Sequence, residues 1–276
     1  MLKNTFIHIP GIGIKTEQRL WDSGVLDWDS YTESITAKLP QSWIAHIGSY
    51  VDNSIEHFQN NDPNYFEKLL PPSRHWRIFS DFRNSTVYLD IETTGLNAWG
   101  NHITTIALYD GESIFHYVKD RNLGDFPQDI QKYKVIVTYN GKCFDVPFIE
   151  NYFGINLTQA HIDLRYILAS LGYRGGLKGC EKQIGINRGD LEDIDGYFAV
   201  LLWHDYKQNR NLKALETLLA YNIQDTVNLE ILMVFSYNMK LHETPFFQNH
   251  QLPLPVQPEN PFRADSETID QIKWDA

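Results

Sequence analysis

Short apolar runs punctuated by turn residues dominate the chain between residues 84 and 240. The first run, TVYLDIE, is β-branched and aromatic and ends at Thr93-Thr94-Gly95, which is typical of a strand. Asp110-Gly111 is a strong hairpin signal between two later runs. Strands are predicted at residues 86–92, 103–109, 113–118 and 135–139, the last nearly all apolar and so buried on both faces.

Longer segments with apolar residues at helical spacing lie between and after these runs. Helices are predicted near residues 126–133, 145–153, 164–171, 177–184, 198–207 and 212–239. Residues 161–164 form an apparent strand-to-helix turn, so Asp163 is a candidate helix cap, or a group that contacts site residues without binding metal itself. Hairpin-linked strands followed by a crossover helix and a buried strand predict a mixed α/β sheet.

Composition divides the chain into three parts. Residues 1–80 combine a glycine hairpin with helical patterns, and residues 81–240 form the main domain. Residues 241–276 are acidic and rich in proline, which interrupts helices, so we expect an extended or disordered tail. We expect the tryptophans of the first part to be core residues rather than platforms for bases: Trp21, Trp28, Trp43 and Trp76.

Bulk composition excludes several classes of protein. The 276 residues are 42% hydrophobic and 13% aromatic, enough for a globular core. Cys143 and Cys180 are too few for a disulfide scaffold or a cysteine-rich zinc site. No run approaches the roughly 20 apolar residues of a membrane helix, and no signal-peptide pattern is present. We therefore expect no membrane partner and a cytoplasmic location.

The net charge of −11 argues against a tight non-specific binder of nucleic acid, because lysine and arginine dominate phosphate binding. One stretch departs from this balance. Between Arg165 and Arg188 there are five basic residues and one acid, Glu181. The negative net charge of the chain is therefore compatible with an enzyme that binds one end of a nucleic-acid strand.

Asp90 and Glu92 lie two residues apart in the first predicted strand and so face the same way. At about 4 Å and an effective dielectric near 20, two carboxylates repel by roughly 4 kcal/mol. A divalent cation is the simplest group that would offset this repulsion. Alternatively, the strand end is exposed and water solvates both acids.

Two further motifs carry acids. Asp145 follows Tyr139-Asn140-Gly141 just past a buried strand, the usual place for a site in an α/β sheet, although an ordinary helix start has the same pattern. Tyr221 and Asp225 lie four residues apart on one face of the longest predicted helix. Apolar neighbours place Asp225 on or beside the core side of that helix.

Taken in order, these motifs resemble exonuclease motifs I, II and III of the DEDDy branch of DnaQ-like 3′–5′ exonucleases, within the ribonuclease H-like superfamily. Thr86–Met239 carries the resemblance, with Asp90 and Glu92 in motif I, Asp145 in motif II, and Tyr221 and Asp225 in motif III. The DEDDh branch has histidine where this chain has Ala220. The resemblance implies a ribonuclease H-like, mixed five-stranded sheet flanked by helices.

The resemblance also implies a two-metal mechanism with Mg²⁺ or Mn²⁺. Asp90 would bridge both cations, with Glu92 and Asp225 on one and Asp145 serving the other, while Tyr221 would orient the attacking water. Nucleic acid is the implied partner, DNA in preference to RNA, with contacts at Thr93 and Asn140. Residues 177–181, Arg188 and residues 195–197 also look like this family, with no role beyond substrate contact.

Residues 9–20 resemble the hairpin of a helix-hairpin-helix motif, which holds backbone phosphate through glycine-rich amides. Gly11 and Gly13 form the hairpin, and Lys15 and Arg19 are spaced to flank a phosphate. Only eight residues precede Ile9, too few for a full first helix. The segment therefore either binds phosphate or only packs on the main domain.

The leading hypothesis is a metal-dependent 3′–5′ exonuclease acting on single-stranded DNA. A ribonuclease or a structure-selective endonuclease of the same superfamily would share the acids and the metal chemistry. A third alternative is an inactive module that binds nucleic acid, although such a module has no need of all four acids.

Overall fold

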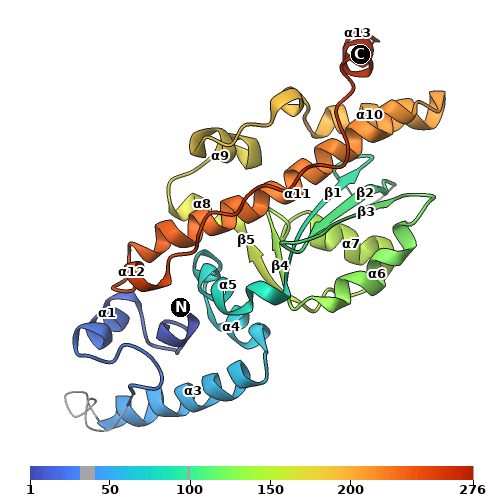
Figure 1. Ribbon diagram of the computed structural model, residues 1–276. Coiled ribbons are helices and arrows are strands. Elements are labelled where there is room, and N and C mark those ends of the chain that lie inside the picture. The colour runs from blue at the N-terminus through green and yellow to red at the C-terminus, as the bar shows by residue number, and fades with distance from the viewer. Residues whose placement is uncertain (32–40, 98–99, 276) are drawn as a thin grey trace.

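A mixed five-stranded sheet forms the centre of the fold in the computed structural model, which describes residues 1–31, 41–97 and 100–275, without the side chains of residues 41–44 (Figure 1). Its strands lie in the order β3-β2-β1-β4-β5, with β1, β2 and β3 antiparallel and β1, β4 and β5 parallel. This topology confirms the predicted sheet. The strands are β1 (Thr86–Thr93), β2 (Ile103–Tyr109), β3 (Ile114–Val118), β4 (Val135–Thr138) and β5 (Ala160–Asp163).

Helices cover both faces of the sheet and build the N-terminal region (Figure 1). Their bounds are α1 (Ile14–Asp22), α3 (Gln41–Gln59), α4 (Pro63–Leu69), α5 (Trp76–Phe82), α6 (Phe126–Asp129), α7 (Asp145–Phe153), α8 (Leu164–Ser170), α9 (Gly176–Ile184), α10 (Gly196–Asn209), α11 (Leu212–Leu241), α12 (Phe247–His250) and α13 (Ser266–Asp275). In these described ranges, no helix combines the length and the apolar content that crossing a membrane requires.

The two faces of β1 carry different side chains because successive residues of a strand point to opposite sides. Val87, Leu89 and Ile91 belong to an apolar cluster that includes residues of α6 and α7. Tyr88 and Asp90 face the other side of the sheet, which α11 crosses. Both faces are therefore buried, and the acids of β1 point into the layer between the sheet and α11.

The long helix α11 connects the parts of the fold, contacting β1, β2, α5 and α10. At 1.5 Å per residue, its 30 residues span about 45 Å. The side chain of Asn211 caps its first turn by accepting from the backbone amides of Lys213 and Ala214, at 3.0 and 3.4 Å. Most of its length is buried, so its polar residues lie in the interior of the protein.

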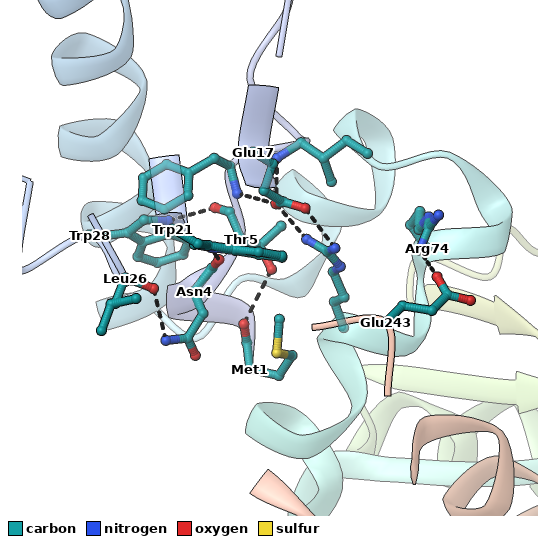
Figure 2. A network of polar contacts seen from close by, with 12 residues as sticks. Met1, Asn4, Thr5, Glu17, Trp21, Leu26, Trp28, Arg74 and Glu243 are labelled. Carbon is teal, nitrogen blue, oxygen red and sulfur yellow. Dashed lines mark hydrogen bonds and ion pairs between the residues drawn. The ribbon is translucent and has the colours of Figure 1, made fainter. Parts of the chain in front are cut away.

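Within the N-terminal region, one buried ion pair, Glu17 with Arg77, joins α1 to α5. Glu17 Oε1 accepts from the backbone amides of Phe6 and Ile7 at 2.8 and 3.0 Å, and Arg77 donates to both carboxylate oxygens at 2.6 and 2.8 Å. Figure 2 shows Glu17 at the centre of this network. Helix α1, the chain before it and α5 are thereby fixed together.

Trp21, Trp28 and Trp76 are buried, as predicted for core residues. The indole nitrogens of Trp21 and Trp28 donate to the carbonyls of Asn4 and Thr5 at 3.0 and 2.8 Å, next to Glu17 (Figure 2). The side chain of Trp43 lies outside the described residues. One apolar cluster contains these three tryptophans together with residues of the sheet and α11.

The tail differs from the expectation of a chain without helices. Residues 251–265 are extended, as predicted, but they lie along α11 and end in the helix α13 (Figure 1). Asn238 pairs with both backbone groups of Leu252, at 2.7 and 2.9 Å, and Asn260 donates to the carbonyl of Ala220 at 2.8 Å. Because Pro261 is the last proline, the residues after it are free to form a helix.

Replacing Arg77 by methionine leaves the Glu17 carboxylate buried without its cation. We expect a loss of about 3–5 kcal/mol in the free energy of unfolding, measured by urea denaturation. The double variant Glu17→Gln, Arg77→Met keeps a carbonyl acceptor for the amides of Phe6 and Ile7 and removes both charges, so it should lose less. An Arg77→Met protein as stable as the double variant would contradict the role given to this pair.

Candidate active site

Three carboxylates from two distant segments converge at the C-terminal end of β1. Asp90 and Glu92 come from the central strand, and Asp225 comes from the face of α11 that lies over it. One oxygen from each lies within 4.8 Å of the others. Glu92 is 8% exposed and Asp225 6% exposed, whereas Asp90 is partly exposed, so the cluster is largely withdrawn from water and does not lie on an open strand end.

Burial places a large electrostatic strain on this cluster. Burial, reinforced by the charges of Asp225 and Asp145, raises the pKa of Asp90 well above its ordinary value. The same causes raise the pKa of Glu92 well above its ordinary value. Lys178 and Arg188 act in the opposite direction on Glu92. The ionised cluster therefore needs additional positive charge.

The geometry of the three oxygens suits a divalent cation. Mg²⁺ binds oxygen at about 2.0–2.1 Å in an octahedron, so opposite ligand oxygens lie about 4.2 Å apart. Adjacent ligand oxygens lie about 2.9 Å apart, so side-chain movements on the order of 1 Å would close three oxygens that lie within 4.8 Å of one another around one ion. Carboxylate oxygens are also the ligand type that Mg²⁺ and Mn²⁺ prefer. Asp90, Glu92 and Asp225 therefore fit such an ion.

Asp145 lies beside this group but outside the set of three close oxygens. It is the first residue of α7, is 4% exposed, and accepts from the backbone amide of Ile91 at 3.3 Å. Burial raises the pKa of Asp145 to about 7, although two backbone hydrogen bonds favour its charged form. Its charge raises the pKa values of Asp90 and Glu92, so the structure brings all four predicted acids into one electrostatic unit.

Tyr221 lies one turn before Asp225 on α11 and is 5% exposed. Burial, followed by the charges of Asp225, Glu92 and Asp90, raises the pKa of Tyr221 above its ordinary value. The phenol therefore keeps its proton at neutral pH. Lys178 Nζ lies 4.9 Å from the centre of its ring, and the guanidinium carbon of Arg188 lies 6.0 Å from it.

Asn222 was missed by the sequence analysis. Its Nδ2 donates to Asp90 Oδ2 at 2.7 Å, and its Oδ1 accepts from the hydroxyl of Thr105 at 3.0 Å. The side chain is fully buried, and Thr105 on β2 fixes its orientation. The available signal was an amide three residues before Asp225, on the same side of a helix whose neighbours are apolar.

Arg188 directly contacts one of the candidate metal ligands. Its Nη1 donates to Asp225 Oδ1 and its Nε donates to Glu181 Oε2. Glu181 Oε1 in turn accepts from Asn228 Nδ2 at 2.9 Å. These side chains are all buried, so Arg188 holds Asp225 by one oxygen and leaves the other available. The sequence indicated no role for Arg188 beyond substrate contact, because spacing does not show which side chains a long arginine reaches.

The predicted nucleic-acid contacts of the main domain lie next to the strand ends. Thr93 is buried at the end of β1, and its hydroxyl donates to the carbonyl of Gly95 at 2.8 Å. Asn140 has a positive φ of 65° after β4, and its Oδ1 accepts from Arg165. Asp163 accepts from the amides of Asn140 and Arg165, at 2.7 and 3.0 Å, which confirms its predicted role as the cap of α8.

The hairpin residues lie far from the carboxylates. Gly11 has φ +86°, Gly13 precedes α1, and Lys15 and Arg19 are exposed on that helix. Trp21 of α1 packs against Phe246, beyond the C-terminal end of α11. Asp225 is 16 residues before Leu241, about 24 Å along the helix axis. Phosphate binding by the hairpin stays a prediction.

The solved structures that match the chain include a DNA polymerase and the protein NrnC, and the comparison with curated proteins found no match. A family B DNA polymerase from the hyperthermophilic archaeon Pyrobaculum calidifontis is 15% identical with a TM-score of 0.43, over 57% of this chain and 24% of the polymerase. Brucella melitensis NrnC is 16% identical with a TM-score of 0.40, over 59% of this chain and 77% of NrnC.

The model of the RNase H superfamily matches residues 87–237, which contain the whole sheet from β1 onward and all five residues of the carboxylate and tyrosine motifs. This match covers more than half of the 276 residues. The chain therefore belongs to the RNase H superfamily.

Proposed function

We propose that the chain is a metal-dependent 3′–5′ exonuclease that removes nucleotides from the 3′ end of single-stranded DNA. The observation that carries this proposal is the convergence of oxygens from Asp90, Glu92 and Asp225 within 4.8 Å in a buried layer of an RNase H superfamily fold. The DEDDy pattern of motifs supports the direction of cleavage. Membership of the superfamily supports nucleic acid as the substrate.

The four acids would hold two divalent cations, Asp90 bridging both, with Glu92 and Asp225 on one and Asp145 on the other. When bound, the cations neutralise charge at the phosphate and lower the pKa of the attacking water. Asn222 orients Asp90 through a 2.7 Å hydrogen bond, and Arg188 fixes one oxygen of Asp225. Asp90 and Asp225 are thereby each held by a buried partner in a set geometry.

Tyr221 would position the attacking water rather than remove its proton. Burial and the neighbouring carboxylates raise the pKa of the Tyr221 phenol, so the group is a hydrogen-bond donor at neutral pH. Its place one turn from Asp225 puts the hydroxyl beside the cation ligands. Positioning by a neutral donor adds to the rate without a proton transfer to the protein.

Asp90→Asn should abolish nuclease activity because it removes the proposed bridging ligand. The metal-free variant should be at least as stable as the wild type, since one repelling charge is gone. The measurements are cleavage of an end-labelled oligonucleotide in Mg²⁺ or Mn²⁺ and thermal unfolding in chelator. Asp190→Asn, which changes an exposed aspartate, is the matched control and should cleave normally. Retained activity in Asp90→Asn would refute the site.

In the absence of metal, the raised pKa of Asp145, about 7, should make stability fall as the pH rises. The folded protein then binds more protons than the unfolded chain between about pH 4 and pH 7, so the free energy of unfolding decreases across that window. Relative to Asp145→Asn, the wild type should lose on the order of 2 kcal/mol between pH 5 and pH 7.

The comparison with Asp145→Asn cancels the opposite contribution of His8 and His161, whose pKa values burial lowers to about 3. Saturating Mg²⁺ or Mn²⁺ should reduce the pH dependence, because a bound cation neutralises the carboxylates in place of protons. Parallel pH profiles for the two proteins in chelator would contradict the electrostatic coupling described for Asp145.

Tyr221→Phe should lower the cleavage rate by roughly 10- to 1,000-fold while leaving strand affinity nearly unchanged, because it deletes one positioning hydrogen bond and keeps the ring. A 5′-labelled strand should give a ladder of shortening products with the wild type, and a 3′-terminal phosphorothioate should delay it. Release of the 5′ nucleotide first, or internal cutting, would favour the endonuclease alternative.

A further inference from the structure

A cavity of about 440 Å³ lies between α9 and the chain that follows it, and two of its lining residues, Lys178 and Arg188, also contact Tyr221 and Asp225 of the candidate site. The charged residues of its lining are the basic Lys178, Lys182 and Arg188 and the acidic Glu181 and Glu192. Arg188 joins the cavity to the cluster, since the same guanidinium donates to Asp225. A molecule in this cavity would therefore lie beside any group bound at the cluster.

The basic residues of this cavity are in different electrostatic situations. Arg188 is committed to the carboxylates of Glu181 and Asp225. Lys178 and Lys182 make no ion pair with any residue in the ranges that the structure describes. They are four residues apart on α9, so both lie on the same side of that helix. The cavity thus presents two uncommitted ammonium groups.

Lys178 is the more unusual of the two. It is half-buried, its Nζ lies 4.9 Å from the centre of the Tyr221 ring, and burial lowers its pKa despite the charge of Asp225. An ammonium group withdrawn from water without a bonded anion is unfavourable. An anionic ligand within hydrogen-bonding distance would supply that partner.

The ligand must be an anion that extends past Tyr221, because the acids of the cluster exclude negative charge from their own position unless cations are present. A phosphodiester strand meets this condition, since its phosphates recur along the chain. With one phosphate at the cluster, the next lies at a neighbouring position.

Resting on the proposed function, we propose that Lys178 and Lys182 bind the phosphate next to the scissile one, with Lys178 as the principal contact. The cavity is then the subsite that makes the enzyme prefer a strand over a substrate with a single phosphate. Tyr221 separates the two phosphate positions, and its ring supports the amine of Lys178.

Lys178→Met should weaken binding of a fluorescent single-stranded oligonucleotide by roughly 10-fold or more, as expected when a charged hydrogen bond is lost. Binding is measured with Mn²⁺ in the Asp90→Asn background to prevent turnover. The plot of log affinity against log salt should become shallower by about 0.7. Lys178→Arg should restore most of the affinity. Lys132→Met is the matched control, an exposed lysine before β4 on the α6 side of the sheet, and should change neither quantity.

A neutral methylphosphonate placed at each of the last three linkages in turn identifies the phosphate. At the linkage next to the scissile one, the methylphosphonate should weaken binding to the Asp90→Asn protein that keeps Lys178. It should change the affinity of the protein that also carries Lys178→Met very little. Additive losses at all three linkages, or unchanged affinity and salt slope in Lys178→Met, would overturn the proposal.

These outcomes are distinguishable from failure of the proposed function. If the wild type degrades the strand but Lys178→Met loses only rate, with its affinity and salt slope intact, then Lys178 acts through Tyr221 and the phosphate subsite is refuted. If the wild type cleaves nothing, the exonuclease proposal fails, while the binding measurements still decide whether the cavity holds a phosphate.

Discussion

Mutual repulsion among buried carboxylates is the constraint around which the main domain is arranged. Asp90, Glu92 and Asp225 lie in a layer closed by β1 on one side and α11 on the other. Water does not screen their charges well at this depth. The protein meets the constraint partly by itself, through the guanidinium of Arg188 and the amide of Asn222. In the proposed function, divalent cations would supply the remaining positive charge.

The basic residues near the carboxylate cluster are either paired with carboxylates or unpaired among the described residues. Arg188 is neutralised by Glu181 and Asp225, so it fixes geometry without adding much attraction for a polyanion. Lys178 and Lys182 lie a few residues earlier and are not neutralised in this way among the described residues. An acidic protein can thus concentrate its attraction for phosphate at one cavity and avoid non-specific binding elsewhere on its surface.

Sequence patterns predicted four of the five strands closely, because those strands are rich in β-branched and aromatic residues and end at turn residues; β5 was implied only by the resemblance to the ribonuclease H-like superfamily. Helix α7 was predicted at its observed bounds, and α10 begins two residues before its predicted start because Asp195 caps it. The resemblance grouped four acids with Tyr221, and the structure brings oxygens of Asp90, Glu92 and Asp225 within 4.8 Å of one another, with Asp145 beside them. The contacts of Asn222 and Arg188 could not be predicted, because they join residues that lie far apart in the chain. Hydrophobic periodicity shows which face of a helix is buried, but not which distant side chain a polar residue on that face contacts.

The tail that follows α11 has a consequence for biosynthesis. Gln257 of the tail donates a hydrogen bond to Asn228, and Asn228 donates one to Glu181. Glu181 accepts from Arg188, which also donates to Asp225. Hydrogen bonds therefore join the extended segment of the tail to the surroundings of Asp225. A ribosome makes Gln257 after every acid of the cluster has emerged. During that interval Asn228 and the carbonyl of Ala220 lack their tail partners. A nascent chain would therefore complete this hydrogen-bond network only after residues 257–260 have been synthesised and have left the ribosome.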